Sequence, residues 1–315
     1  MSRHLCLIFV LLLLVSCKMS TNADKQFGNT NPGRTYWLRL NPAAGSSYEY
    51  ETKNESDIVM KVNGEETHVI NRVTVGTEYT IDKDSTGNFL IGISYKKILL
   101  YTRNADGEGE LNAANGSFSA NPVEKMLGIL KNAHIIATVS PVGEVKQMNG
   151  YQEFTDTVLS KFALTNAADR RVAEKQWNQM VGDGIIRKNI GQLFQLFPDS
   201  AIHAGDKWKI NLSQNGDIKL ITKAIYSLSD INNGNAIIRI VGKISSDSTG
   251  STIMNYPVST QLQGEQEGVY EVDMKSGMVL KGKVSAKVEG SIMVIGREVP
   301  VTIKTTIDVA GYQKK

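Results

Sequence analysis

Hydrophobic and polar residues alternate over long stretches of this chain, at the period of a half-buried β-strand. In the first half, one parity of residues 68–81 is apolar and the other is polar, the apolar set being Val69, Val73, Val75, Tyr79 and Ile81. The same alternation runs from residue 207 to the C-terminus, in runs about twice the usual strand length of 5–6 residues. Such strands twist and coil, and their apolar face requires a covering layer.

The pattern changes to helical spacing between about residues 151 and 197. Apolar residues recur there every three or four positions, as in Phe154, Val158 and Phe162, and later in Ile186, Ile190, Leu193 and Phe197. A shorter helix is expected after Asn121, which is a favourable cap, with Pro122 at the first helical position. These stripes predict helices that turn one face to a core.

We therefore expect an α+β fold, in which long antiparallel β-strands form one curved sheet or two related sheets and a helical insert packs against them. Local breaks in the pattern predict a hairpin from 48–55 and 57–62 and a separate short strand over 35–40. The expected segments are a signal peptide over 1–16, a lipidated cysteine and flexible tether over 17–34, an N-terminal β-rich half over 35–149, the helical insert over 150–199 and a C-terminal β-rich half over 200–315.

The first 17 residues have the pattern of a bacterial lipoprotein signal. Arg3 and His4 precede an apolar run, Leu5 to Val15, that is too short to span a bilayer as a helix, which needs about 20 residues. The run ends in Leu14-Val15-Ser16-Cys17, which resembles a lipobox. That resemblance implies cleavage before Cys17, acyl chains on Cys17 and a membrane partner reached through those chains.

The residues after Cys17 indicate where such a lipoprotein would go. Lys18 stands where an Asp would resemble an inner-membrane retention signal, and no acidic pair follows that would resemble a surface-export signal. We therefore expect a lipid-anchored protein of the outer membrane that faces the periplasm. Residues 18–34 are polar and contain few apolar side chains, so they predict a flexible tether.

Composition narrows the functional classes. The 315 residues carry a net charge of +3 that is spread evenly, so we expect no nucleic-acid partner. The two cysteines, Cys6 and Cys17, both lie in the N-terminal signal, so the folded body has no thiol for a disulfide, a metal or catalysis. We expect no metal, no cofactor and no catalytic residues, and we expect the protein not to be an enzyme.

Three acidic stretches were weighed as sites. The run Asp82-Lys83-Asp84-Ser85-Thr86-Gly87 begins like a calcium loop but has Ile93 where a bidentate Glu belongs, so a turn is favoured. The run 104–110 is interpreted as a solvated loop for the same reason. His203 has Asp199 and Asp206 near it but no nucleophile motif, so turn chemistry is favoured over catalysis. Short Asp-Ser/Thr motifs in loops, such as Asp84-Ser85-Thr86, also resemble bacterial O-glycosylation sites.

Several motifs together resemble one family. They are the lipobox, Tyr36-Trp37-Leu38-Arg39-Leu40, Gly45-Ser46-Ser47-Tyr48-Glu49-Tyr50, Ser140-Pro141-Val142-Gly143, and Phe197-Pro198-Asp199 followed by Gly205-Asp206-Lys207-Trp208. This combination is similar to the Bacteroidota lipoproteins grouped as domain of unknown function 6263. The resemblance implies no activity and no site residues. The plan of long strands with helices is also similar to periplasmic lipoprotein carriers of the half-barrel type, by analogy of fold.

The sequence thus predicts an envelope lipoprotein rather than an enzyme. One interpretation is that it binds an apolar or polymeric envelope ligand between sheet and helices. The other is that it is a structural or protein-interaction lipoprotein with an envelope protein as partner and no small-molecule ligand. The motif Ala204-Gly205 before a strand echoes Ala44-Gly45 in the first half, which is compatible with an internal repeat.

Overall fold

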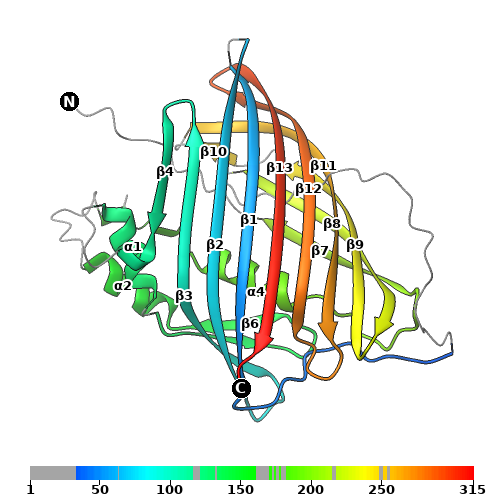
Figure 1. Ribbon diagram of the computed structural model, residues 1–315. Helices are drawn as coiled ribbons and strands as arrows, with labels where there is room; N and C mark the ends of the chain where they lie inside the picture. Colours follow the sequence, from blue (N-terminus) through cyan, green and yellow to red (C-terminus); the bar gives the residue numbers. More distant parts are fainter. Residues whose placement is uncertain are drawn as a thin grey trace.

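A single large β-sheet dominates the computed structural model (Figure 1). The structure describes residues 33–62, 64–115, 121–131, 133–160, 170–171, 174, 177–178, 182–214, 218–247, 251–253 and 256–315. The predicted signal peptide and all but the last residues of the predicted tether lie outside these residues.

The first half contributes six strands: β1 (Ser47–Val62), β2 (Glu65–Lys83), β3 (Phe89–Asn104), β4 (Gly107–Asn112), β5 (Ile135–Val139) and β6 (Val145–Asn149). The second half contributes seven: β7 (Lys207–Gln214), β8 (Lys219–Asn232), β9 (Asn235–Asp247), β10 (Ser251–Ile253), β11 (Tyr256–Asp273), β12 (Val279–Val294) and β13 (Arg297–Gln313). The predominance of long antiparallel strands is as predicted.

All strands belong to one 13-stranded sheet, with the order β6-β5-β3-β2-β1-β13-β12-β11-β9-β8-β7, β4 beside β3 and β10 beside β11. Every pairing is antiparallel. The strands β1 and β13, which come first and last along the chain, are neighbours in the middle of the sheet. They pair over 13 residue pairs, from Tyr48–Gln313 to Met60–Val301. Of the two arrangements left open by the sequence, the structure therefore has the single sheet.

Two expected local elements are corrected. Residues 47–62 form one continuous strand, β1, and not the hairpin expected from 48–55 and 57–62. Two polar residues at the expected break, Asn54 and Ser56, are buried on the same face as Tyr48 and Tyr50. Instead of a strand over 35–40, the structure has an isolated bridge between Tyr36 and Ile202.

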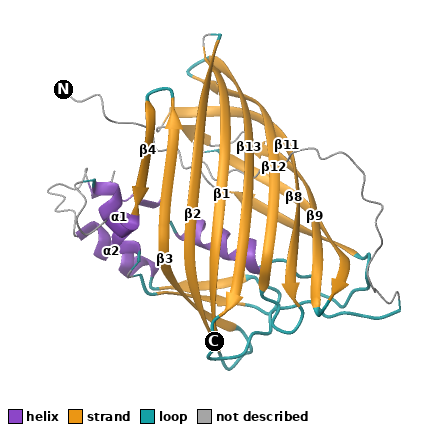
Figure 2. Cartoon of the chain, in the orientation of Figure 1, coloured by secondary structure: helices purple, strands orange, loops and turns teal. Residues whose placement is uncertain are grey.

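The described helices are short and lie on one side of the sheet (Figure 2). They are α1 (Pro122–Leu130), α2 (Tyr151–Ser160) and α4 (Asp183–Phe194), with a 3-10 turn η1 at Ala113–Asn115. As predicted, Asn121 caps α1, its side-chain oxygen accepting a hydrogen bond from the Val123 N–H at 2.8 Å, and Pro122 opens the helix. None of the described helices has the length and apolar character needed to cross a membrane.

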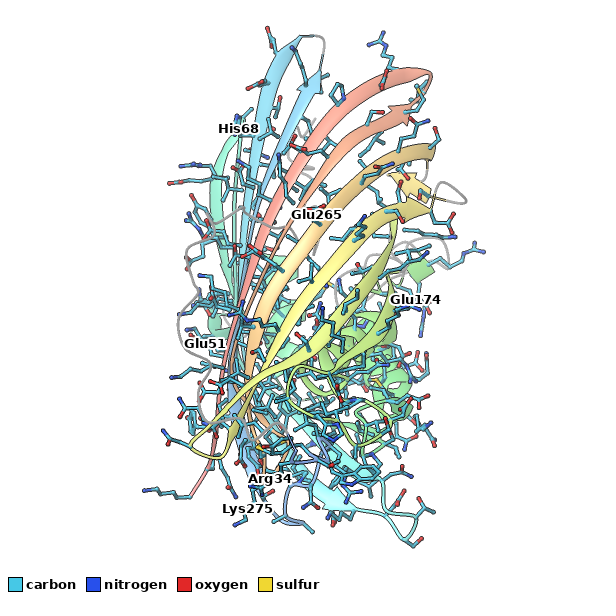
Figure 3. The ribbon with its side chains drawn as sticks, turned by 90° about the vertical axis from the view of Figure 1, so that its right-hand side faces the viewer. Arg34, Glu51, His68, Glu174, Glu265 and Lys275 are labelled. Carbon is cyan, nitrogen blue, oxygen red and sulfur yellow. The ribbon has the colours of Figure 1, made fainter. Side chains whose placement is uncertain are left out.

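The sheet curves toward the helices, and we call the face on that side the concave face (Figure 3). Glycines along β11 accompany this curvature. A Cβ at Gly268 would lie 2.7 Å from the Lys283 carbonyl oxygen, and one at Gly264 would lie 2.2 Å from the Lys287 carbonyl oxygen. Such close approach of β12 requires glycine at both positions, and glycines of this kind permit bends in long strands.

Two hydrophobic clusters lie on the concave face. The lower cluster combines strand residues with helix residues such as Leu127, Val158, Ile190 and Phe194. The upper cluster lies toward the β1–β2 turn and consists of Ile58, Ile218, Leu220, Ile244, Val258, Leu262, Ala286, Val288, Ile292, Val301 and Ile303. Its members lie on strands, or directly before β8 in the case of Ile218, and none belongs to a described helix.

The end of α4 is held in the lower cluster by aromatic contacts. The Phe194 ring meets Tyr79 of β2 edge-on at a centroid distance of 5.5 Å and Tyr50 of β1 at 6.5 Å. Edge-to-face pairs of this kind add to the stabilisation from burial. Beyond the helix, the Trp208 indole N–H of β7 donates to the Leu196 carbonyl oxygen at 3.0 Å. The chain between α4 and β7 is therefore fixed at both of its ends.

The opposite, convex face is charged. Glu78 on β2 accepts hydrogen bonds from Lys314 at 2.7 Å, Lys96 at 2.6 Å and Ser47 at 2.9 Å. These interactions, that with Lys314 first, lower the pKa of Glu78 to about 2. Lys314 also contacts Glu49 at 3.3 Å, so the C-terminal end of the chain is tied to β1 and β2 by charge.

Candidate functional site

The concave face has a row of small and polar residues where apolar residues would be expected. The row follows the register directly across eight strands, from β3 to β8 in sheet order: Thr102, Asn71, Ser56, Thr305, Ala286, Gln266, Gly242 and Ala224. We call it the central row. It lies between the lower and upper clusters, because the next row up contains Ile58 and Ile303 and the next row down contains Ile307 and Val284.

Gln266 is the largest side chain in the central row and has only small side chains beside it. Gly268 and Gly264 are its neighbours on the same face of β11, while Ala286 of β12 and Gly242 of β9 face it across the sheet. The Gln266 side chain lies over Gly242, where an added Cβ would come within 2.8 Å of its Cγ. The backbone around the buried Gln266 amide therefore has no large side chain beside it.

Four buried polar atoms on this face have no hydrogen-bond partner among the described residues. They are Gln266 Oε1 and Thr305 Oγ1 in the central row, Thr260 Oγ1 farther up β11 and the Tyr50 hydroxyl in the lower cluster. All four residues are at most 3% exposed. An unpaired buried polar atom costs about 1–3 kcal/mol, and in native proteins it usually marks a bound water, an ion or another group. By contrast, Thr102 donates to Asn71 at 2.9 Å.

A small cavity lies between the central row and α4. Its volume is about 20 Å³, and its lining includes Gln192 of α4 together with Gln266, Tyr226 and Tyr270. That volume is enough for one water molecule or one small polar group. This cavity beneath α4 is thus too small for a larger ligand.

The polar side of α4 lies at the same level. Lys188 and Gln192 are one turn apart on α4, so they share a helix face. Both are half-buried. Burial lowers the pKa of Lys188 to about 8, because an ammonium group that is removed from water loses its charge more readily. Gln192 reaches the cavity, and the opposite face of α4 packs Ile186 and Ile190 into the lower cluster.

The candidate sites weighed from the sequence have ordinary structural roles. Asp84 Oδ1 accepts from the N–H groups of Thr86 at 2.8 Å and Asn88 at 2.9 Å, which makes the run 82–87 a hairpin turn between β2 and β3. Run 104–110 is the turn from β3 to β4 and the first part of β4. Nowhere in the described ranges do three or more His, Cys, Asp or Glu side chains gather as a metal site.

His203 is exposed and lies in a turn. Its N–H donates to Asp206 Oδ2 at 2.7 Å, which is the main cause of the lowered pKa of Asp206. The His203 ring lies 3.4 Å from Asp206 on one side and 3.4 Å from the Thr35 hydroxyl on the other. These contacts fit a turn that the Asp206 carboxylate stabilises, which is the interpretation favoured from the sequence. Cys17, the expected lipidation site, lies outside the described residues and stays a prediction.

The central row was missed in the sequence, although a signal for it is present. Asn54 and Ser56 on β1, Asn71 on β2, and Gln266 on β11 all stand at positions with apolar parity. The hairpin expected from 48–55 and 57–62 places its break at Ser56. A polar residue that recurs on the buried parity of several long strands would have indicated a polar band inside the sheet.

The convex face has a shallow depression of about 490 Å³. It is lined by charged residues of both signs, with Val269 and Ile237 among them, and the full lining is Glu51, Lys53, Ile237, Val269, Glu271, Lys281, Gly282, Lys283, Asp308, Val309 and Ala310. Beside it, Val241 is 63% exposed and faces Ile225 across the strands, which is 45% exposed. Glu51 and His68 lie on this side of the sheet, away from the helices (Figure 3).

A family model described as a family of unknown function (DUF6263) matches residues 86–279, which is more than half of the chain. The match includes the described helices and the stretch 196–208. Membership of this family, which the sequence motifs indicated, is therefore confirmed. No curated protein matches this chain.

Similar solved structures include two proteins of Pseudomonas species, of which the second is an outer membrane channel. OccK7 (OpdD) of Pseudomonas aeruginosa is 6% identical with a TM-score of 0.24, over 86% of this chain and 100% of the other. A channel of Pseudomonas putida F1 is 8% identical with a TM-score of 0.23, over 90% and 100%. An outer membrane lipoprotein-sorting protein domain of Vibrio parahaemolyticus is 9% identical with a TM-score of 0.14, over 81% and 83%. Scores this far below 0.5 carry no argument about function.

Proposed function

Since this chain belongs to the family of unknown function DUF6263, which brings no activity, we propose its function from its own residues. We propose that it is a lipid-anchored envelope protein that binds an apolar ligand on the upper part of its concave face. It acts by holding this ligand and not by catalysis. The ligand lies over the upper cluster, beyond the region that α4 fills.

The observation that carries this proposal is the contrast between the two clusters. The lower cluster is completed by helix residues, whereas no described helix supplies a residue to the upper cluster. Large apolar surfaces of sheets require a covering layer. In Figure 1, α4 lies behind the strands and α1 and α2 lie beside β3, and in Figure 3 the helices lie to the right of the lower part of the sheet. Leu262, Val288 and Ile303 are at most 1% exposed, so the proposed ligand has to take the place of the protein atoms that now cover them.

The envelope location and anchor rest on the N-terminal signal. The lipobox-like Leu14-Val15-Ser16-Cys17 supports acylation of Cys17, and Lys18 supports an outer-membrane protein facing the periplasm. Several acyl chains anchor stably, because each buried CH₂ contributes about 0.8 kcal/mol. A protein held in this way at the membrane surface has apolar ligands close to its concave face.

Acylation predicts that labelled palmitate enters the protein in growing cells and that Cys17→Ala abolishes this labelling. The chain offers a matched control, since Cys6→Ala removes the other thiol and should leave labelling unchanged. Labelling that persists in Cys17→Ala, or that depends on Cys6, would contradict the proposed anchor.

Ligand binding predicts saturable fluorescence enhancement of a dansyl-labelled undecanoic acid added to the mature chain with Cys17→Ser. Leu262 is 1% exposed in the upper cluster. Leu262→Asp should weaken binding at least about tenfold, because an unpaired charge in an apolar site is strongly unfavourable. Leu262→Ala, which preserves folding better, should weaken it in the same direction.

The matched control for this titration is Val241→Asp. Val241 also lies in a long strand of the sheet, but on the convex face and exposed. Its substitution should leave the affinity unchanged. A wild-type protein that gives no saturable change, or equal losses in Leu262→Asp and Val241→Asp, would contradict ligand binding on the concave face.

A second function, docking of an envelope protein without a small-molecule ligand, is favoured by one observation. Val241, Ile225 and Val269 leave apolar side chains exposed on the convex face, beside the charged depression. Exposed apolar patches ringed by polar residues are typical of protein interfaces. This surface does not explain the unpaired polar atoms on the other face, so ligand binding remains our first proposal.

A further inference from the structure

We propose that the lower end of the molecule, opposite the β1–β2 turn, lies against the surface of an anionic lipid bilayer. The Trp37 ring lies at the interface, and three cationic side chains face the lipid headgroups: Arg34, Arg39 and Lys275. This inference rests on the anchor proposed at Cys17 and specifies how the anchored body meets its membrane. It does not depend on a ligand on the concave face.

The backbone of residues 36–40 holds the Trp37 side chain outward. Alternate residues of this segment are buried in the lower cluster, namely Tyr36, Leu38 and Leu40. Trp37 lies between them on the other side of the backbone and is 60% exposed. The segment is fixed by two hydrogen bonds between the main chains of Tyr36 and Ile202, at 2.7 and 2.9 Å. The exposed ring is thus presented by a packed part of the chain.

Three cationic side chains share this end of the molecule. The Arg39 guanidinium lies over the Trp37 ring, 5.6 Å from its centroid. Arg34 and Lys275 are exposed, and both are seen at the lower end in Figure 3. Membrane interfaces favour such a combination, because an indole ring is amphipathic and cations are attracted to anionic headgroups.

Two carboxylates near these cations are used within turns. Asp273 accepts a hydrogen bond from the Ser276 N–H at 3.0 Å, and Asp206 accepts one from the His203 N–H at 2.7 Å. The turn with Ser276 lies against the segment, because the Asn41 N–H donates to the Ser276 carbonyl oxygen at 2.7 Å. These carboxylates stabilise the backbone that places the cations, and they leave the cations available to lipid phosphates.

The chain that leads to Cys17 favours this end over the upper end. Gly33 precedes Arg34 at the lower end and is 16 residues after Cys17. As a coil, such a stretch spans about 20–24 Å, and fully extended it spans about 55 Å. The 16 residues of β1 place the upper end about 50 Å farther away. An anchor at Cys17 therefore brings the lower end to the membrane, whereas contact by the upper end would require an almost fully extended chain.

The test is binding of the mature chain with Cys17→Ser to vesicles of phosphatidylethanolamine and phosphatidylglycerol in equal parts. Trp37 reports on the contact, because the other two tryptophans are shielded. Trp177 is 0% exposed, and the half-buried Trp208 donates its indole N–H to Leu196. We expect a saturable blue shift of tryptophan fluorescence, and quenching by lipids that carry bromine on their acyl chains.

Two matched double variants locate the contact. Trp37→Ser with Arg39→Gln removes the ring and one cation, and it should weaken vesicle binding at least about tenfold. Ile295→Ser with Arg297→Gln makes the same kind of change at the upper end, where Ile295 is 74% exposed and Arg297 is also exposed. This control should leave binding unchanged when it is measured by vesicle sedimentation. Far-UV circular dichroism should show both variants folded, since all four side chains are exposed.

The cations predict a dependence on lipid charge. Arg34→Gln should weaken binding to the anionic vesicles about fivefold, which is the effect of one cation near an anionic membrane. On vesicles of phosphatidylcholine alone, the same variant should bind as wild type does. A loss of equal size on both kinds of vesicle would overturn the role of charge.

The outcomes separate this proposal from the proposed function. If wild-type protein gives no saturable shift, or both double variants lose binding equally, the lipid contact at the lower end is overturned. If only the Ile295 double variant binds more weakly, the upper end meets the membrane and the proposal is wrong. If palmitate labelling fails while the Trp37 double variant behaves as expected, the anchor fails and the lipid contact stands.

Discussion

Replacing Gly143 with alanine is expected to lower the free energy of unfolding by about 4 kcal/mol. Gly143 lies in the turn between β5 and β6 and has a φ of +88°, a conformation that L-residues with a Cβ adopt at a cost. An added Cβ would lie 1.7 Å from the carbonyl oxygen of Phe194. The backbone at the end of α4 must therefore move, and the Phe194 ring must leave its contacts with Tyr50 and Tyr79.

The control for this prediction is Gly205→Ala. Gly205 has a nearly identical φ of +89°, but an added Cβ meets nothing within 4 Å. Gly205→Ala should lower the free energy of unfolding by about 1 kcal/mol, from the backbone conformation alone. Urea unfolding followed by far-UV circular dichroism measures both. Equal losses in the two variants would show that the turn Ser140–Glu144 does not rest against α4.

The second large effect is expected from Ile238→Ala, which should lower the free energy of unfolding by about 3–4 kcal/mol. Ile238 on β9 is 0% exposed and belongs to the lower cluster, where helices complete the core. Ile303 on β13 is also 0% exposed but belongs to the upper cluster. If the atoms that cover Ile303 yield to a ligand, Ile303→Ala should lower the free energy of unfolding by only about 1 kcal/mol in protein freed of lipid, because a loosely held cover can collapse into the space that the shorter side chain leaves.

This pair of isoleucines compares the same substitution on the same face of one sheet. Unfolding is measured after refolding from guanidinium, which removes bound lipid, and again with added dansyl-labelled undecanoic acid. The ligand should stabilise wild type more than it stabilises Ile303→Ala, since binding to the native state adds to stability by mass action. A loss at Ile303 as large as that at Ile238 without ligand would mean that protein atoms fill the upper cluster as an ordinary core.

Much of the sheet could be predicted from the sequence, because the alternation in β2, β8, β9 and β13 is a direct consequence of burying one face. The cap of α1 at Asn121 and the turn at Asp84 were equally local signals. The number of sheets could not be predicted, because the pairing of β1 with β13 depends on residues more than 230 positions apart along the chain. Alternation gives the face of each residue but not the neighbour of each strand.

The candidate site was beyond sequence analysis for the same reason. Asn71, Thr305 and Gln266 are far apart in the sequence and become one row only when the register aligns the five strands from β2 to β11. Asn54 and Ser56 are visible as polar residues, but the sequence alone does not show which residues lie beside them in the sheet. The lipid anchor at Cys17 depends on a local motif outside the described residues and stays a prediction, as do the absence of catalysis and the periplasmic orientation.

The most direct test of the central claim is a crystal structure of the mature chain purified without detergent or organic solvent. We predict continuous elongated density over Leu262, Val288 and Ile303. Helical or loop residues of the chain itself packed over these three side chains, with no space for a ligand, would contradict it.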